Sequence, residues 1–200
     1  METLESNKVG LNNIEVSGEL LLELLEGVST HASKEKQLIT LNAVQIEGEG
    51  GILTARATDR YRLIEGDVRS LDGQFDPALI SLEDIKRIIT LLKSHKGHVI
   101  SLTRLGNALT VSALGDAVTF TLLEGNYPAF SELLSKAEGE PAGVESVAFN
   151  PAFMADYGKI AGKRNGVKVH FTGDKRPMRV QINSNTITWK ALLMPMRFID

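Results

Sequence analysis

The stretch FDPALISLED, residues 75–84, decides how this chain folds. Its first half predicts a strand, and Ser81 then stands at the position of a helix N-cap. Two acids follow in the first helical turn, where the helix dipole favours negative charge. The next apolar residues recur at helical spacing on one face: Ile85, Ile88, Ile89 and Leu92. The stretch therefore predicts a strand that runs directly into an amphipathic helix, which Gly97 ends.

The same order of features occurs once before and once after this stretch. Residues 14–16 lead to Ser17 and a helical stripe of leucines, while residues 144–149 lead to Asn150 and a proline at the first helical position. Gly166 is expected to end the third helix. The three caps are spaced by 64 and 69 residues. This spacing predicts a unit that occurs three times.

Three strands are expected after each helix. They cover residues 37–47, 52–58 and 60–68 in the first unit, 98–104, 108–113 and 117–123 in the second, and 167–172, 178–182 and 186–194 in the third. The sequence thus predicts an α+β fold of three repeated β-α-β-β-β units, with the helices on one face of antiparallel sheets. Three unrelated α+β segments are the alternative.

A stretch with the character of a linker separates the second and third units, and it includes EGEPAG at residues 138–143. We therefore expect a domain of two units at residues 1–130, a linker at 131–143 and a half-domain at 144–200.

Composition limits the class of protein. The chain has 200 residues, no cysteine and a net charge of −3, which excludes disulfides, thiolate zinc sites and cysteine nucleophiles. No apolar run approaches the roughly 20 residues that span a bilayer, and the first residues lack the pattern of a signal peptide. We expect a cytoplasmic protein without membrane contact, which would bind nucleic acid only through a local basic face.

The residue patterns of common catalytic and metal sites are missing from the sequence. The four histidines are scattered, and no nucleophile elbow or pair of carboxylates stands out. Residues 158–163 have the wrong spacing for a phosphate-binding loop. We expect a protein that is not an enzyme and needs no cofactor or metal, with a hydrolase on an α+β scaffold as the alternative from another class.

Two of the expected helices carry cations on the side away from their apolar stripe. These cations are Lys86, Arg87, Lys93 and Lys96 on the second helix and Lys159, Lys163 and Arg164 on the third. Cations near a helix C-terminus are also favoured by the helix dipole alone. The first helix differs, because Glu19, Glu23 and Glu26 dominate it.

Three motifs, taken together, resemble the bacterial DNA polymerase beta sliding clamp family. They are LNAV at 41–44 leading to ATDRYRL at 57–63, EGNYPAF at 124–130, and FNPAF at 149–153 leading to LMPMR at 193–197. The resemblance extends from about residue 13 to residue 198, and residues 30–33 and 57–63 look most like those of clamps from actinobacteria or their phages. It implies a clamp fold, whose helices line a hole around duplex DNA.

The resemblance also implies a pocket that docks DNA polymerase and other proteins carrying short clamp-binding motifs. Carried over by position, the pocket residues are Leu41, Thr58, Arg62, Leu63, Pro128, Leu133, Leu192, Met194, Pro195 and Met196. Leucines and flexible methionines suit an adaptable apolar groove for a short motif. The seven cations named above would contact phosphates without reading sequence.

The chain departs from the family in having three units, where a clamp subunit has six. The leading expectation is a processivity factor that forms a homo-oligomer through strands of its first and third units, because unpaired sheet edges are templates for pairing. Residues 1–12 could instead cap these edges. The rival expectation is a clamp mimic or adaptor without a ring, which binds clamp-interaction motifs and competes with a host clamp.

Overall fold

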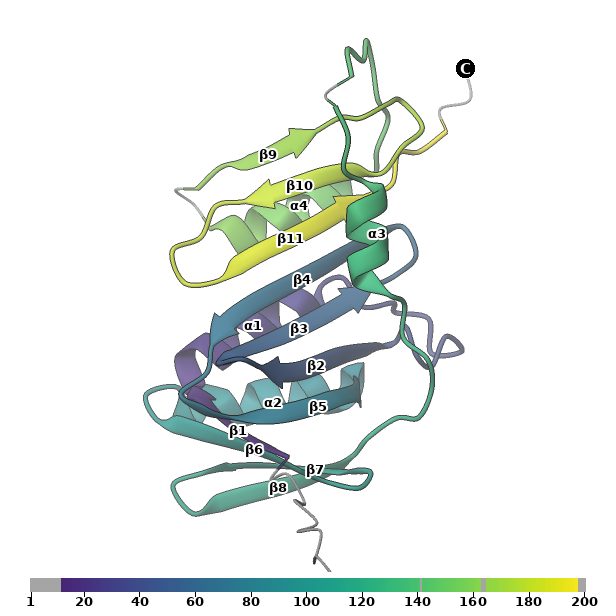
Figure 1. Ribbon diagram of the computed structural model, residues 1–200. Helices are drawn as coiled ribbons and strands as arrows, with labels where there is room; N and C mark the ends of the chain where they lie inside the picture. The colour runs from purple at the N-terminus through teal and green to yellow at the C-terminus, as the bar shows by residue number, and fades with distance from the viewer. Residues whose placement is uncertain (1–11, 141, 163–164, 198–200) are drawn as a thin grey trace, which may run out of the picture.

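The computed structural model describes residues 12–140, 142–162 and 165–197 (Figure 1). The first unit contains β1 (Asn13–Ser17), α1 (Gly18–Ser29), β2 (Ala43–Glu49), β3 (Ile52–Thr58) and β4 (Arg62–Arg69). The second contains β5 (Asp72–Ser81), α2 (Leu82–His95), β6 (Val99–Leu105), β7 (Ala108–Ala113) and β8 (Asp116–Thr121). After α3 (Phe130–Lys136), the third contains α4 (Pro151–Ala161), β9 (Val167–His170), β10 (Met178–Ile182) and β11 (Thr188–Leu193).

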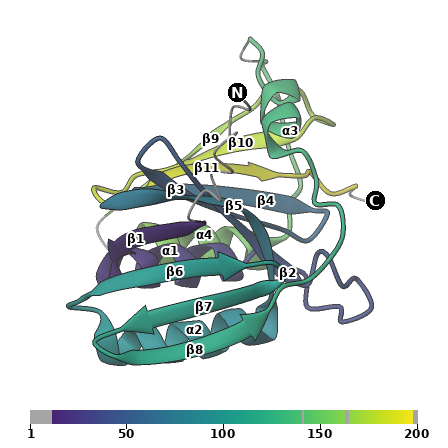
Figure 2. The ribbon, with the colours of Figure 1, turned by 60° about the horizontal axis from the view of Figure 1, so that its bottom comes forward.

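All eleven of these strands form one sheet, in the order β8-β7-β6-β1-β5-β2-β3-β4-β11-β10-β9. The three unit helices α1, α2 and α4 cover one face of this sheet, while α3 lies on the other face (Figures 1 and 2). Neighbouring strands are antiparallel throughout. The α+β clamp architecture expected from the sequence is therefore confirmed. No helix in the described ranges is long and apolar enough to cross a membrane.

The first two units exchange their leading strands. β1 of the first unit pairs with β5 and with β6 of the second, while β5 of the second pairs with β2 of the first. Leading strands therefore need a partner unit beside them. The third unit has no such partner in the described chain, and the strand expected at residues 144–149 is wrong: only Ala148 forms a bridge there, with Met196.

The third unit joins the first through β4 and β11, which pair antiparallel along their length. The two outer strands of the described sheet are then β8 and β9. The expectation that first-unit strands form an open edge is therefore wrong, because each of them has two neighbours. A possible cap formed by residues 1–12 lies, apart from Asn12, outside the described residues.

The helix caps follow the sequence signals in part. The side chains of Ser81 and Asn150 accept hydrogen bonds from the backbone N–H groups of Asp84 and Ala152, each at 3.0 Å. Ser17 precedes α1 without a side-chain cap. α2 ends at His95, before Gly97. α4 ends at Ala161 and its C-cap is Gly162, whose φ is 73°, so Gly166 is not its terminator.

Two further expectations are corrected. Residues 37–42 are turn and loop, and β2 begins only at Ala43. The beginning of the expected linker forms α3 with Phe130, because Phe130 and Ala137 bury apolar surface against the sheet.

Candidate functional site

The candidate docking surface is built where β4 and β11 meet. Leu63 and Leu192 lie directly opposite one another in the β4·β11 register. α3 lies across them on the sheet face opposite the unit helices (Figure 1). We call the resulting apolar group the α3 cluster; its buried members are Leu63, Phe130, Ala137 and Leu192, and Tyr127 and Leu134 pack against it. The sequence-predicted pocket leucines therefore meet, but each is only 5% exposed.

Accessible apolar surface lies at the margin of the α3 cluster. Leu133 is 38% exposed, Met194 39% and Met196 54%. The backbone of the tail is fixed, because the N–H of Met194 donates to the carbonyl of Tyr61 at 2.8 Å and that of Met196 to Ala148 at 2.7 Å. Flexible methionine side chains on a fixed backbone can adapt to an apolar ligand.

The remaining predicted pocket residues are less available. Leu41, Pro128 and Pro195 are partly buried. Thr58 is buried, and its hydroxyl donates to the carbonyl of Arg62 at 2.7 Å. These residues therefore lie under or beside the docking surface and expose little side-chain area to a ligand.

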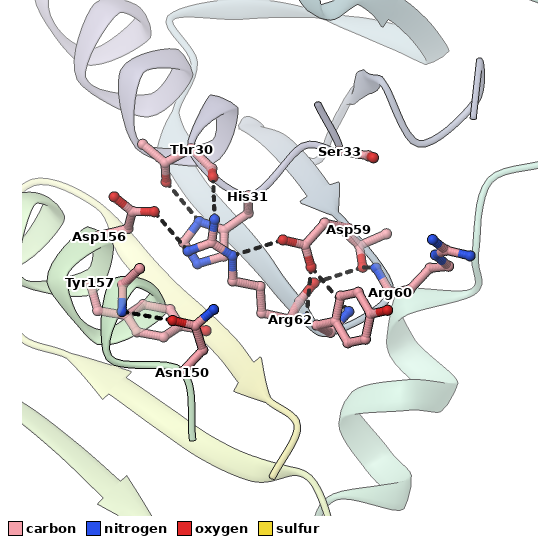
Figure 3. A network of polar contacts seen from close by, with 12 residues as sticks. Thr30, His31, Ser33, Asp59, Arg60, Arg62, Asn150, Asp156 and Tyr157 are labelled. Atoms are coloured by element: carbon pink, nitrogen blue, oxygen red, sulfur yellow. Dashed lines mark hydrogen bonds and ion pairs between the residues drawn. The ribbon is translucent and has the colours of Figure 1, made fainter. Parts of the chain in front are cut away.

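Arg62 lies on the other face of β4. Neighbouring residues of a strand point to opposite faces, so Leu63 faces α3 while the guanidinium of Arg62 reaches the helix side. There it bonds Asp59 at 3.0 Å, Asp156 of α4 at 2.9 Å and the carbonyl of Thr30 at 2.7 Å (Figure 3). It also lies 4.2 Å from the centre of the Phe153 ring. The structure therefore separates Arg62 from the surface that its neighbour helps to form.

His31 completes this network. Its ring is fully buried, and its centroid lies 4.8 Å from that of Tyr157. Its Nδ1 is 2.8 Å from the hydroxyl of Thr30, while Nε2 has no hydrogen-bond partner among the described residues. Burial, with Arg62 close by, lowers the pKa of His31 well below its usual value, so the ring is neutral at pH 7.

Asp156 and Tyr157 attach α4 to the same place. Burial raises the pKa of Asp156, but hydrogen bonds from Lys159 and Arg62 outweigh it, so the net shift is downward. The hydroxyl of Tyr157 donates to the carbonyl of Leu192 at 3.0 Å. No sequence motif indicated a functional role for Asp156, Tyr157 or His31. Strand alternation is the sequence signal that predicts a polar site on the helix side, because Arg62 must point to that side when Leu63 points to the opposite face.

The outer face of the same join carries an ion-pair ladder. Lys190 of β11 bonds Glu65 at 2.8 Å and Asp67 at 3.2 Å, both on β4. Arg56 of β3 pairs with Glu65 and also with Glu47. Burial raises the pKa of Glu65, but Lys190 and Arg56 reverse the shift and lower it overall.

The predicted DNA-contacting cations are exposed but partly paired. Arg87 bonds Asp84 at 2.9 Å, Lys93 bonds Glu26 of α1 at 3.1 Å, and Lys159 bonds Asp156 at 2.7 Å. Lys86 and Lys96 are exposed and form no ion pair within the described ranges. Lys163 and Arg164 lie outside the described residues. The helix face is thus mixed in charge, because acidic α1 lies beside basic α2.

The part of the chain that the structure describes contains no evident metal site. There, no three histidine, aspartate or glutamate side chains are grouped so that they could hold a metal ion. A hollow of about 270 Å³ is lined by Ala137, Glu138, His170 and Arg179, among others, and by none of the predicted pocket residues.

Comparisons with known proteins point to one family. No family model matches the chain. The beta sliding clamp of Micrococcus luteus is 29% identical in an alignment of 162 positions, which covers 78% of this chain and 51% of the clamp. This chain therefore spans about half the length of the curated relative that it matches.

Solved structures agree on the fold. The DNA polymerase III beta subunit of Thermotoga maritima superposes with a TM-score of 0.80 at 17% identity, covering 100% of this chain and 70% of that one. The sliding clamp of Bacillus subtilis gives 0.77 at 18% identity, covering 100% and 67%. The resemblance expected from the three sequence motifs is confirmed: the chain has the fold of the bacterial beta sliding clamps and resembles this family in sequence over most of its length.

Proposed function

We propose that the chain acts as a DNA polymerase processivity factor of the sliding-clamp type. The observation that carries this proposal is the clamp fold itself, with three helices on one face of a continuous sheet (Figure 1). Exposed apolar side chains, Leu133, Met194 and Met196, lie beside the α3 cluster. In this role the protein has no catalytic activity, works in the cytoplasm and holds partner enzymes near duplex DNA.

Partner docking would use the margin of the α3 cluster. A short motif gains most from apolar anchor residues that fill an adaptable groove, and Leu133, Met194 and Met196 offer such surface. The buried pair Leu63 and Leu192 would form its floor. The expected partners are DNA polymerase and other proteins with clamp-binding motifs.

The docking test compares two exposed double substitutions. Leu133→Ala with Met194→Ala should weaken binding of a short apolar clamp-binding peptide at least tenfold from about micromolar affinity, near −8 kcal/mol. Leu105→Ala with Leu114→Ala is the matched control, because these leucines are 81% and 73% exposed, at the end of β6 and in the turn between β7 and β8. Fluorescence anisotropy gives the affinities. Equal affinity in both folded variants would remove the docking surface from this proposal.

DNA contact would use the helix face. Lys86→Glu with Lys96→Glu should weaken association with duplex DNA in a strongly salt-dependent way, since phosphate contacts release counterions. Lys168→Glu with Arg179→Glu is the control, because Lys168 and Arg179 are exposed cations on the strands β9 and β10. Electrophoretic mobility at several salt concentrations measures the difference. Equal losses in both variants would contradict a DNA-facing helix side.

A second candidate follows from the mixed charge of the helix face. Glu26 neutralises Lys93, and the chain as a whole carries a charge of −3. A clamp mimic or adaptor that binds motifs without a ring requires no DNA contact. Peptide binding together with no DNA association, even at low salt, would favour this candidate.

A further inference from the structure

The turn between β3 and β4 has an arginine where a turn of its kind favours glycine. The N–H of Asp59 donates to the carbonyl of Arg62 at 3.3 Å, so Arg60 and Tyr61 are the two central residues of the turn. Arg60 has a φ of 80°, whereas the φ of Tyr61 is not positive. A hairpin turn whose first central residue has a positive φ usually has glycine there. Arg60 therefore adopts a backbone conformation that is unfavourable for a residue with a side chain.

Hydrogen bonds on both sides of Arg60 hold this conformation. The N–H of Arg60 donates to the hydroxyl of Thr58 at 3.3 Å. The carboxylate of Asp59 accepts from the N–H groups of Tyr61 and Arg62, each at 3.0 Å. Figure 3 shows the Arg60 side chain extending away from the buried guanidinium of Arg62. A strained residue that its surroundings hold in place is typical of functional sites, and here it directs an exposed cation away from the core.

Arg60 lies next to the docking surface. The carbonyl of its neighbour Tyr61 accepts the hydrogen bond from the N–H of Met194 at 2.8 Å. The guanidinium carbon of Arg60 is 5.9 Å from the centre of the Tyr61 ring, and Tyr61 is 56% exposed. A cation therefore stands beside accessible apolar surface that a tyrosine ring and a methionine provide.

The ion pair that Arg60 forms within the chain is weak. Its Nη2 lies 3.4 Å from Oε1 of Glu35, and the two side chains are 51% and 50% exposed. A pair this long and this exposed contributes little, because solvent screens it and two long side chains lose freedom. Asp59, in contrast, is bound to the buried Arg62 at 3.0 Å. Arg60 can therefore exchange Glu35 for a carboxylate that a partner supplies.

We propose that Arg60 determines the specificity of the docking surface by binding an acidic side chain next to the apolar anchors of the docked motif, and that Glu35 competes with this side chain. A planar guanidinium binds a carboxylate through two parallel hydrogen bonds, and rim charges of this kind set selectivity more than affinity. The inference rests on the proposed docking function. It adds the chemistry of the partner, which is an apolar peptide with an aspartate or glutamate beside its anchors.

Glu35 acts as an internal competitor in this arrangement. It stands between Lys34 and Lys36 in an exposed part of the segment that joins α1 to β2. An acidic motif must displace Glu35 from Arg60, whereas a neutral motif leaves the pair intact. Removal of the Glu35 carboxylate should therefore strengthen the binding of acidic peptides and leave that of neutral peptides unchanged. A side chain that only stabilised its own segment would not distinguish the two kinds of peptide.

Charge exchange in the peptide and in the protein tests the role of Arg60. The probes are short apolar clamp-binding peptides with aspartate placed in turn before, between and after their apolar residues, and asparagine and lysine versions of each. At the best position, the aspartate peptide should bind the parent about threefold more tightly than the asparagine peptide, which is the effect of an exposed ion pair. Fluorescence anisotropy gives the affinities. Arg60→Gln should abolish this preference, and Arg60→Glu should reverse it in favour of lysine.

Further variants separate the charge from the fold. Arg60→Gly suits the positive φ, so it removes the side chain without strain and should lose the preference as Arg60→Gln does. Glu35→Gln should tighten binding of the aspartate peptide about twofold and leave the asparagine peptide unchanged. Arg69→Gln is the matched control, because Arg69 is an exposed arginine at the opposite end of β4, and it should keep the preference of the parent.

The outcomes distinguish this inference from the proposed function. Equal affinities of the aspartate and asparagine peptides at every position, or a preference that persists in both Arg60→Gln and Arg60→Gly, would overturn the role of Arg60 and leave the apolar docking surface in place. Weaker binding of the aspartate peptide to Glu35→Gln would overturn the competition. A parent protein that binds none of the peptides would overturn the docking surface and this inference together.

Discussion

The β4·β11 join and the β8 edge place the same strand of the repeat in two situations. At the join, the third unit lies against the first, and both faces of the contact carry specific partners. Arg62 holds Asp59, Asp156 and the carbonyl of Thr30 on the helix side, while Lys190 bridges Glu65 and Asp67 on the outer side. The strand β8, in contrast, has mainly threonine, alanine and valine side chains and a single charged residue. The backbone therefore permits strand pairing both at the join and at β8. Only at the join do side chains on both faces stabilise the pairing.

Apolar packing separates the two regions further. Trp189 of β11 fills the space left by two glycines of the first unit. A Cβ at Gly66 would lie 2.5 Å from the Trp189 ring and 2.6 Å from Leu24, and one at Gly27 also 2.5 Å from that ring. Near β8, Phe120 is covered by Arg87, whose guanidinium lies 5.2 Å from the ring. The join is thus a packed core contact between two strands, whereas β8 has no second strand beside it within the described chain.

The largest effect is expected from Arg62→Met, which breaks the join from its buried side. Removing one partner of a buried ion pair leaves the other charge uncompensated and costs about 3–5 kcal/mol, here at Asp59, because Asp156 keeps Lys159 as a partner at 2.7 Å. Urea denaturation measures the free energy of unfolding.

Arg60→Met is the control for this change. Arg60 is exposed and reaches Glu35 at 3.4 Å, and a surface pair of this kind contributes about 1 kcal/mol or less. Adding Asp59→Asn to Arg62→Met should recover part of the loss, because the charge that is left without its ion partner disappears. Equal effects of the two arginine substitutions would show that the buried network does not hold the join.

A smaller loss is expected from Gly66→Ala. The added methyl meets Trp189 and Leu24, and overpacking of a filled core costs about 1–3 kcal/mol. Gly158→Ala is the control, since a Cβ there meets nothing within 4 Å and lies inside α4. It should raise stability by about 0.5–1 kcal/mol. Thermal unfolding followed by circular dichroism compares them, and a stabilising Gly66→Ala would contradict the close packing of Trp189.

His31 should make the stability of the join depend on pH. Its pKa is lowered in the folded protein, so the unfolded chain binds the proton more readily. Stability from this group is complete above the unfolded pKa of about 6.5 and is lost as pH falls below it. The free energy of unfolding should therefore decrease between pH 8 and pH 5.5.

His31→Gln should remove most of this decrease, whereas His98→Gln, at an exposed position, should retain it. Asp156 acts in the same direction at lower pH, because its pKa is also lowered and its contribution fades only as pH falls below the ordinary range of a carboxyl group. A parent protein with constant stability from pH 8 to pH 5.5 would show that the buried ring does not titrate with unfolding.

Much of the fold could be predicted from local signals. The caps Ser81 and Asn150 mark helix starts that the structure confirms, and the bounds of β3, β7 and β10 coincide with the expected strands. These signals lie within a few residues of the element that they specify. The absence of a leading strand at residues 144–149 could not be predicted in this way, because such strands depend on a second unit beside them.

The candidate site shows the same limit. Leu63 and Leu192 could be assigned to one surface from the family resemblance, and the structure places them opposite one another. The helix α3 that covers these two leucines could not be predicted, because SELLSKA at residues 131–137 resembles the start of a linker. Only the packing of Phe130 and Ala137 against the sheet makes this segment part of the fold. The family resemblance assigns Arg62 to the pocket by position, although strand alternation turns its side chain to the opposite face. The pocket and DNA-contacting residues otherwise remain predictions.

The smallest change in the free energy of unfolding is expected from a substitution on the outer face of the join. Its size shows which face of the join contributes more to the attachment of the third unit. Lys190 is half exposed, with 49% of its side chain accessible, so its bonds to Glu65 and Asp67 are weakened by solvent. Lys190→Met should cost about 1 kcal/mol or less, and added salt should reduce the difference from the parent. Glu65 keeps Arg56 as a partner in this variant, so no buried charge is left alone. Urea denaturation could instead show that Lys190→Met lowers the free energy of unfolding as much as Arg62→Met does. In that case the ion-pair ladder stabilises the join more than the buried arginine, and the difference between the join and β8 rests on surface charge.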